Sequence, residues 1–174
     1  MVLLDIVQRA LPHDAFKVFF TNTHMEYPDT YQYIDTIRKW CAERQIDFIV
    51  CESDKVPEET WREFGPPATR IRWCCSVHKT APQMLKAREI VGKPDIRTFS
   101  FVGVRASESL TRSAYDFLCK SKKHNGEDTL NAILEWNSAE VWLYLYMHNL
   151  PINPAYAKGN KRVGCLLCPG ATKR

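Results

Sequence analysis

The chain has 174 residues, of which 45% are hydrophobic and 25% charged, as in a globular protein with a core of its own. Its net charge of +4 suits a small anionic substrate and does not require nucleic acid. No apolar run reaches the roughly 18 residues of a membrane span, and the N-terminal residues lack the pattern of a signal peptide. Seven cysteines in that context indicate a reducing cytoplasm, so we expect a cytoplasmic domain covering residues 1–174.

The hydrophobic pattern predicts alternating helices and strands. The expected helices cover residues 2–10, 29–44, 56–64, 75–91 and 138–149. The expected strands cover residues 16–21, 47–51 and 98–104, with a polar loop at 121–128 and a short extended piece at 131–135. Such alternation predicts an α/β fold with a mainly parallel sheet flanked by helices. Ligands of these sheets bind at the carboxyl ends of the strands.

Four cysteines stand in two close pairs, Cys74-Cys75 and Cys165-Leu166-Leu167-Cys168. Thiolates from two distant segments can converge on one metal centre. Adjacent residues of a helix point about 100° apart, which favours a wide [4Fe–4S] cluster over a single zinc ion. Zinc remains the alternative metal, and two pairs of buried free thiols remain the alternative without metal.

Both pairs lie in longer motifs. The first is Trp-Cys-Cys-Ser-Val-His-Lys-Thr-Ala-Pro at 73–82, and the second is Asn-Pro-Ala-Tyr-Ala-Lys-Gly-Asn-Lys-Arg-Val-Gly-Cys-Leu-Leu-Cys at 153–168. Together they resemble the cluster-bearing branch of the PAPS/APS reductase family. The resemblance implies an adenine nucleotide alpha-hydrolase-like (Rossmann-like) fold and a cluster held by Cys74, Cys75, Cys165 and Cys168. Lys79 matches the lysine that follows the cysteine pair in that branch.

The segment Thr-Asn-Thr-His-Met-Glu-Tyr-Pro-Asp-Thr at 21–30 follows the first expected strand. It resembles the family's D-T-G-x-x-F/Y-P-E-T segment, with Asn22 in place of Asp and His24 in place of Gly. The resemblance makes Thr23 a candidate for substrate binding, and the alternative is a polar loop that leads into a helix cap.

The segment Gly-Val-Arg-Ala-Ser-Glu-Ser-Leu-Thr-Arg at 103–112 follows the third expected strand. The guanidiniums of Arg105 and Arg112 can clamp phosphate or sulfate oxygens, and a helix beginning at Ser107 would add backbone N–H donors. The segment also resembles the family's G-x-R-x-x-x-S-x-x-R, which adds Ser109 to the site. The alternative is a pair of surface arginines.

Cationic residues precede the second cysteine pair. Lys158, Gly159 and Arg162 could hold substrate anions or offset the negative charge of a cluster, whereas we expect Lys161 to be solvated. Lys79 would act on cluster and substrate together.

Two family features are missing from the sequence. The phosphate loop S-G-G-K-D-S has no counterpart, since the opening Met-Val-Leu-Leu-Asp-Ile resembles the residues that follow that loop. No cysteine follows Cys168, although the reductases use a cysteine of a C-terminal tail as nucleophile. We expect a fragment of a longer chain, a misassigned start, or a subunit completed by a partner chain or in a homo-oligomer.

The resemblance implies a reductase that converts adenylyl sulfate or 3′-phosphoadenylyl sulfate to sulfite, with a thioredoxin-like thiol as reductant. A sulfur transferase of the same superfamily, using ATP as in DNA phosphorothioation, is the first alternative. A non-catalytic cluster-binding fragment is the second, because the phosphate loop is missing.

Overall fold

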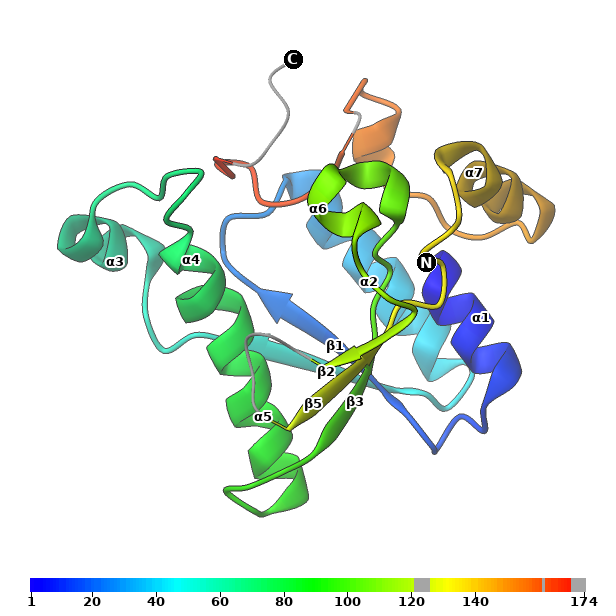
Figure 1. Cartoon of the computed structure of the whole chain (residues 1–174), viewed down its shortest axis with the longest axis horizontal. Coiled ribbons are helices and arrows are strands. Elements are labelled where there is room, and N and C mark those ends of the chain that lie inside the picture. The colour runs from blue at the N-terminus through cyan, green and yellow to red at the C-terminus, as the bar shows by residue number, and fades with distance from the viewer. Residues whose placement is uncertain (121–125, 161, 170–174) are drawn as a thin grey trace. The chain divides into compact units, whose positions relative to one another are not determined.

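The computed structural model describes residues 1–120, 126–160 and 162–169 (Figure 1). The chain divides into two compact units. The first unit comprises residues 1–12 and 93–151, and the second begins at residue 13, runs to residue 92 and resumes at residue 152. That residues 1–174 form a single domain stays a prediction.

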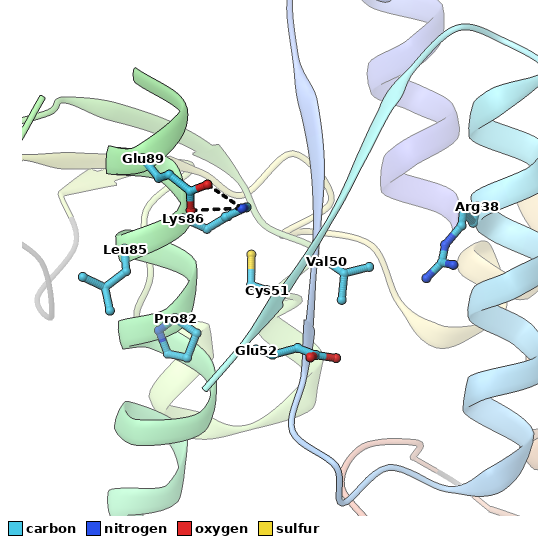
Figure 2. Close-up of a pocket in the computed structure, with 8 residues that line it drawn as sticks. All are labelled: Arg38, Val50, Cys51, Glu52, Pro82, Leu85, Lys86 and Glu89. Carbon is cyan, nitrogen blue, oxygen red and sulfur yellow. Dashed lines mark hydrogen bonds and ion pairs between the residues drawn. The ribbon is translucent and has the colours of Figure 1, made fainter. Parts of the chain in front are cut away.

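The second unit is built on two parallel strands, β1 (Lys17–Asn22) and β2 (Asp47–Glu52). The helix α2 (Pro28–Ala42) connects them, and Pro28 suits its first turn because that position needs no backbone donor. Helices α2 and α5 (Ala81–Val91) lie on opposite sides of the strand pair (Figures 1 and 2). Because β1 and β2 are parallel, their carboxyl ends lie at the same edge of the strand pair, where the sequence predicts ligand binding.

A continuous helical segment carries the first cysteine pair. It begins as α4 (Trp73–Cys75), continues as the π-helical turn η1 (Ser76–Thr80) and ends as α5. The backbone N–H of Ala81 donates to the carbonyl of Ser76, a bond five residues back. The distortion stands directly before Pro82, which has no N–H to donate. The helix expected over residues 75–91 is therefore widened to a π turn just before this proline.

The second unit also contains the helix α3 (Pro57–Phe64) and the short turn η3 (Pro154–Tyr156). A hollow of about 480 Å³ lies beside β2 and α5 (Figure 2). Half of its lining residues are charged, and two of them, Lys86 and Glu89, form an ion pair at 2.8 Å. The lining residues are Arg38, Val50, Cys51, Glu52, Pro82, Leu85, Lys86 and Glu89. The residues predicted from the motifs therefore lie elsewhere.

The first unit contains a three-stranded sheet in the order β3 (Thr98–Phe101), β5 (Glu127–Leu130) and β4 (Leu118–Lys120). Strands β3 and β5 are parallel, whereas β4 and β5 are antiparallel. Around the sheet lie α1 (Val2–Ala10), η2 (Ala106–Glu108), α6 (Leu110–Ser113) and α7 (Ser138–Met147). The α/β class with parallel strands flanked by helices is thus confirmed.

Two expectations for this unit are wrong. Residues 127 and 128, expected in a polar loop, begin β5, while 121–125 of that loop lie outside the described residues. Residues 131–135, expected to be extended, form a turn, in which Asn131 donates its side-chain amide to the carbonyl of Asp116 at 2.8 Å. An asparagine that bonds to nearby backbone favours a turn over a strand.

Helices α1 and α7 of the first unit meet at a buried carboxylate. Asp5 is 2% exposed. It accepts hydrogen bonds from Arg9 Nε at 2.8 Å and from the Tyr144 hydroxyl at 2.9 Å. Burial raises the pKa of Asp5, but the bonds from Arg9, Tyr144 and Gln8 outweigh it, so the pKa lies below the ordinary 3.8.

Replacing this carboxylate should destabilise the first unit in a pH-dependent way. Asp5→Asn is expected to cost about 2 kcal/mol of unfolding free energy at pH 7, because a charged acceptor is lost from a buried site. The pKa of Asp5 is lowered by folding, so its contribution is complete above about pH 4 and is lost as the pH falls through the folded-state pKa. Denaturant unfolding at pH 7 and pH 3 measures this. The control is Asp116→Asn, which changes an exposed carboxylate of the same unit. If the difference in unfolding free energy between Asp5→Asn and the parent grows towards pH 3, the account is contradicted.

No helix among the described residues is both long and apolar enough to cross a membrane.

Candidate functional site

A tight turn follows β1 and presents the first group of polar side chains. His24 has φ of 58°, in the left-handed region that glycine adopts without steric cost. Its backbone N–H donates to Asn22 Oδ1 at 3.0 Å, and the Tyr31 hydroxyl donates to the same oxygen at 3.3 Å. This geometry explains why the motif that the segment resembles has glycine here. The turn directs Thr23 inward, where it is 1% exposed.

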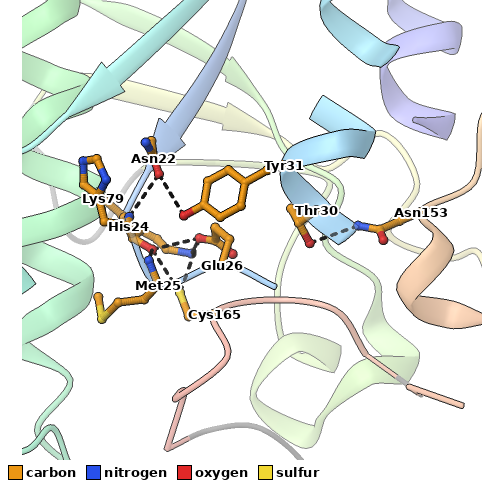
Figure 3. A network of polar contacts seen from close by, with 10 residues as sticks. Asn22, His24, Met25, Glu26, Thr30, Tyr31, Lys79, Asn153 and Cys165 are labelled. Carbon is orange, nitrogen blue, oxygen red and sulfur yellow. Dashed lines mark hydrogen bonds and ion pairs between the residues drawn. The ribbon is translucent and has the colours of Figure 1, made fainter. Parts of the chain in front are cut away.

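The segment of the second cysteine pair pairs with this turn (Figure 3). Glu26 and Cys165 form an antiparallel bridge, and the backbone N–H of Leu166 donates to the carbonyl of Met25 at 2.7 Å. Thr23 Oγ1 lies 3.7 Å from Cys165 Sγ. The structure therefore places Thr23 directly beside a predicted cluster ligand.

Glu26 links the turn and the Cys165 segment to the helix of the first cysteine pair, through Lys79 of that helix (Figure 3). Its Oε1 accepts a hydrogen bond from Thr23 Oγ1 at 3.0 Å, lies 3.5 Å from Cys165 Sγ and forms an ion pair with Lys79 Nζ at 3.6 Å. Its side chain is only 6% exposed. Sequence reasoning gave Glu26 little weight, because a carboxylate in a polar loop ordinarily faces water. The available signal was Lys79, a partly exposed lysine of the cysteine-bearing helix whose ammonium needs an anionic partner.

Three of the four predicted ligands influence one another electrostatically. Burial raises the pKa of Cys74 to about 11, with further contributions from Cys75 and Cys165. Burial also raises the pKa of Cys165, while the nearby ammonium of Lys79 acts in the opposite direction. The fourth ligand, Cys168, closes a turn with its backbone N–H 3.2 Å from the carbonyl of Cys165.

These thiols have the chemistry of a metal or cluster site. All four are free of disulfides. Neighbouring thiolates repel one another, and a bound cation relieves that repulsion. Within residues 1–120, 126–160 and 162–169, however, no three His, Cys, Asp or Glu side chains are already arranged to hold a metal ion. The donor set fits a cluster in type, and Cys74, Cys75 and Cys165 lie near enough to influence one another, while we assign no coordination geometry.

A buried histidine anchors the cysteine-bearing helix. His78 is 0% exposed, and its Nε2 lies 3.0 Å from Thr60 Oγ1. Because the Thr60 hydroxyl donates to the carbonyl of Pro57 at 2.8 Å, we assign the proton of this contact to His78 Nε2. Burial lowers the pKa of His78, with a smaller contribution from His24, which favours the neutral ring. This bond links η1 to α3, at a residue that lies between the cysteine pair and Lys79 in the sequence.

The predicted anion-binding residues lie together in the first unit. Arg105 Nη1 donates to Ser138 Oγ at 3.2 Å, and its Nη2 lies 3.4 Å from Glu108. Arg112 forms an ion pair with the other oxygen of Glu108. Ser109 caps α6, with Oγ 3.3 Å from the backbone nitrogen of Arg112.

The helix expected to begin at Ser107 is not formed as predicted. The chain makes a single turn of 3-10 helix, η2, and then the four-residue α6, with Ser109 extended between them. Helices this short offer little dipole. The two guanidiniums therefore carry the positive charge of this site.

The remaining predicted residues lie in the second unit, before Cys165. Lys158 is paired with Asp29, at 2.7 and 2.9 Å from its two carboxylate oxygens. Gly159 has φ of 86°, a conformation that side chains disfavour. Arg162 is exposed, and Lys161 lies outside the described residues.

Comparison with known proteins agrees with these motifs. Curated relatives include two uncharacterized proteins of Methanocaldococcus jannaschii, 31% and 30% identical over 91% and 97% of this chain. The chain spans about a third of their length, 36% and 34%. An adenosine 5′-phosphosulfate reductase of Bacillus cereus (strain B4264) is 29% identical over 97% of this chain and 68% of its own length.

A solved structure has a similar fold. The phosphoadenylyl-sulfate (PAPS) reductase from Candida auris, in a phosphate complex, matches with a TM-score of 0.66 and 21% identity, covering 95% of this chain and 75% of that one. The family model described as phosphoadenosine phosphosulfate reductase domain matches residues 1–171. The chain therefore belongs to the phosphoadenosine phosphosulfate reductase family.

Proposed function

We propose that this chain carries the cluster-binding and anion-binding parts of an iron–sulfur sulfonucleotide reductase. The substrate would be adenylyl sulfate or its 3′-phosphorylated form, and the reductant a thioredoxin-like dithiol. In the overall reaction, one thiol attacks the sulfate sulfur and the S–O bond to the nucleotide phosphate breaks. A second thiol then releases sulfite as the disulfide forms, and the nucleotide leaves as AMP or its 3′-phosphate.

The observation that carries this proposal is the contact network in Figure 3. It brings the turn after β1, the helix of the first cysteine pair and the segment of the second pair together through Thr23, Glu26, Lys79 and Cys165. Ligands of α/β proteins bind at the carboxyl ends of such strands. Lys79, whose side chain is 40% exposed, supplies a positive charge next to the buried carboxylate of Glu26 and the sulfur of Cys165, as a site that holds negative charge requires.

Four cysteines would hold the cluster: Cys74, Cys75, Cys165 and Cys168. When bound, the cluster would supply a compact electrostatic centre in the second unit. Lys79 would offset its charge from one side, and the Thr23 hydroxyl lies within reach of the sulfur of Cys165. Glu26 would hold Lys79 in place.

The anionic end of the nucleotide would bind to Arg105 and Arg112, with Ser109 shaping the loop between them. Guanidinium groups suit phosphate and sulfate because their N–H donors match two oxygens at once. Lys158, Gly159 and Arg162 are proposed as further substrate contacts. For Lys158 this requires exchange of its partner Asp29 for the substrate.

The test is sulfite release by anaerobically prepared protein supplied with a dithiol and one nucleotide at a time. Sulfite formed from adenylyl sulfate or its 3′-phosphorylated form, and absent without nucleotide, is the expected result. Turnover of ATP without sulfite would contradict the proposal and indicate a sulfur transferase. Failure to bind any of the three nucleotides with the cluster present would contradict it in favour of a cluster-binding role alone.

A further inference from the structure

We propose that Glu108 is a specificity-determining residue, which restricts the site of Arg105 and Arg112 to multiply charged anions. The inference rests on the proposed function, because it takes the two arginines as the anion site. It adds a role for a residue that the motif leaves unspecified.

The argument begins with the position of the carboxylate. One Glu108 oxygen lies 3.4 Å from Arg105 Nη2, and the other forms an ion pair with Arg112 Nη1. All three side chains are largely shielded, with 18%, 26% and 28% of Arg105, Glu108 and Arg112 exposed. Glu108 thus bridges the two guanidiniums with one oxygen on each, as a bound sulfate or phosphate group would.

An incoming anion must therefore compete with a carboxylate that is already in place. Glu108 is three residues from Arg105 and four from Arg112, so its local concentration is far higher than that of a free ion. A monoanion such as acetate carries the same charge and no further acceptor oxygens. It gains nothing by displacing Glu108.

A sulfate or phosphate group differs in two respects. It offers more oxygens, so it can use guanidinium N–H groups that one carboxylate leaves unused, and it carries more charge. The three side chains together keep a single positive charge, which attracts such a group weakly before Glu108 moves aside. Removing the Glu108 charge should strengthen binding of all anions and weaken the discrimination among them.

The test is a titration with inorganic sulfate, and separately with acetate, at constant ionic strength. The side-chain Nε–H signals of the arginines in the ¹⁵N-labelled protein report binding. Glu108→Gln should bind sulfate roughly five- to tenfold more tightly than the parent, as expected for loss of two shielded ion pairs. It should also respond to acetate, to which the parent does not. The exposed Glu135→Gln, in the same unit, should match the parent, and circular dichroism should show both variants folded.

Sulfate binding by Glu108→Gln that is unchanged or weaker would overturn the inference, and weaker binding would make Glu108 a positioning residue for the arginines. The Arg105→Ala/Arg112→Ala variant separates this failure from failure of the anion site. If that variant loses sulfate binding while Glu108→Gln binds sulfate no more tightly than the parent, the anion site is correct and the specificity role of Glu108 is wrong. If that variant binds sulfate as the parent does, the assignment of the anion site is wrong, and so is the specificity role of Glu108.

Discussion

Anaerobically prepared protein is expected to contain about four iron and four acid-labile sulfide per chain, with a broad absorption band near ~400 nm. Cys165→Ser should lose nearly all of both. Cys165 is the proposed ligand at the centre of the network, next to Thr23 and Glu26 and within the influence of Lys79 and Cys74. Metal analysis and the visible spectrum measure the effect.

The matched control is Cys119→Ser, which changes a partly exposed cysteine of the first unit. Its sulfur accepts only a long contact from Asn131 at 3.6 Å, which a hydroxyl can replace, so iron content should stay that of the parent. One zinc and no sulfide per chain would contradict the cluster and indicate a structural Cys₄ site instead. Iron retained by Cys165→Ser would remove this cysteine from the ligand set.

Arg105→Ala/Arg112→Ala should weaken binding of adenylyl sulfate at least about 100-fold and leave iron content unchanged. Two charge-assisted contacts are lost, and each such bond contributes about 1.5–3 kcal/mol. The two arginines belong to the first unit, whereas the four cysteines predicted to bind the cluster belong to the second. The variant should therefore separate substrate binding from cluster binding, as isothermal calorimetry with metal analysis would measure.

Arg97→Ala provides the control for charge alone. Arg97 lies in the same unit, is 84% exposed and pairs with Asp128 at 3.7 Å. Its removal lowers the net charge without touching the proposed site, so nucleotide affinity should change by less than about twofold. Equal losses in Arg97→Ala and the double variant would mean that binding responds to net charge and not to a clamp.

Local patterns predicted the second unit well because its strands and helices are marked by apolar runs and prolines. The strand expected at residues 16–21 is β1 at Lys17–Asn22, and the helix expected at 56–64 is α3 at Pro57–Phe64. Strand β5 was missed for a physical reason. Its polar residues are satisfied across the sheet, where Ser100 donates to Glu127 at 2.8 Å and Arg97 pairs with Asp128. Such cross-strand pairs leave no periodic hydrophobic signal.

The candidate site shows a similar division. The resemblance to the family made Thr23, Lys79 and Cys165 candidate site residues, and the structure brings these three side chains together. Two features of the site could not be predicted from the sequence. Glu26 gained importance only through the partners that the fold gives it, and Lys158 is held by Asp29, a residue far away in the sequence. Partners of this kind depend on tertiary contacts, which no local pattern encodes.

The π turn η1 has a consequence for how one helix can serve two purposes. The Thr80 hydroxyl donates to the carbonyl of Cys75 at 3.0 Å, so a side chain adds a hydrogen bond at the widened turn. Each residue advances an α-helix by about 100°, so an extra residue in the turn rotates everything after it relative to everything before it. The face of α5 that packs on β2 and the face that bears Cys74 and Cys75 are therefore offset from each other by this added rotation. One helical segment can thus pack against the strands with its second half and direct two sulfur atoms elsewhere with its first half.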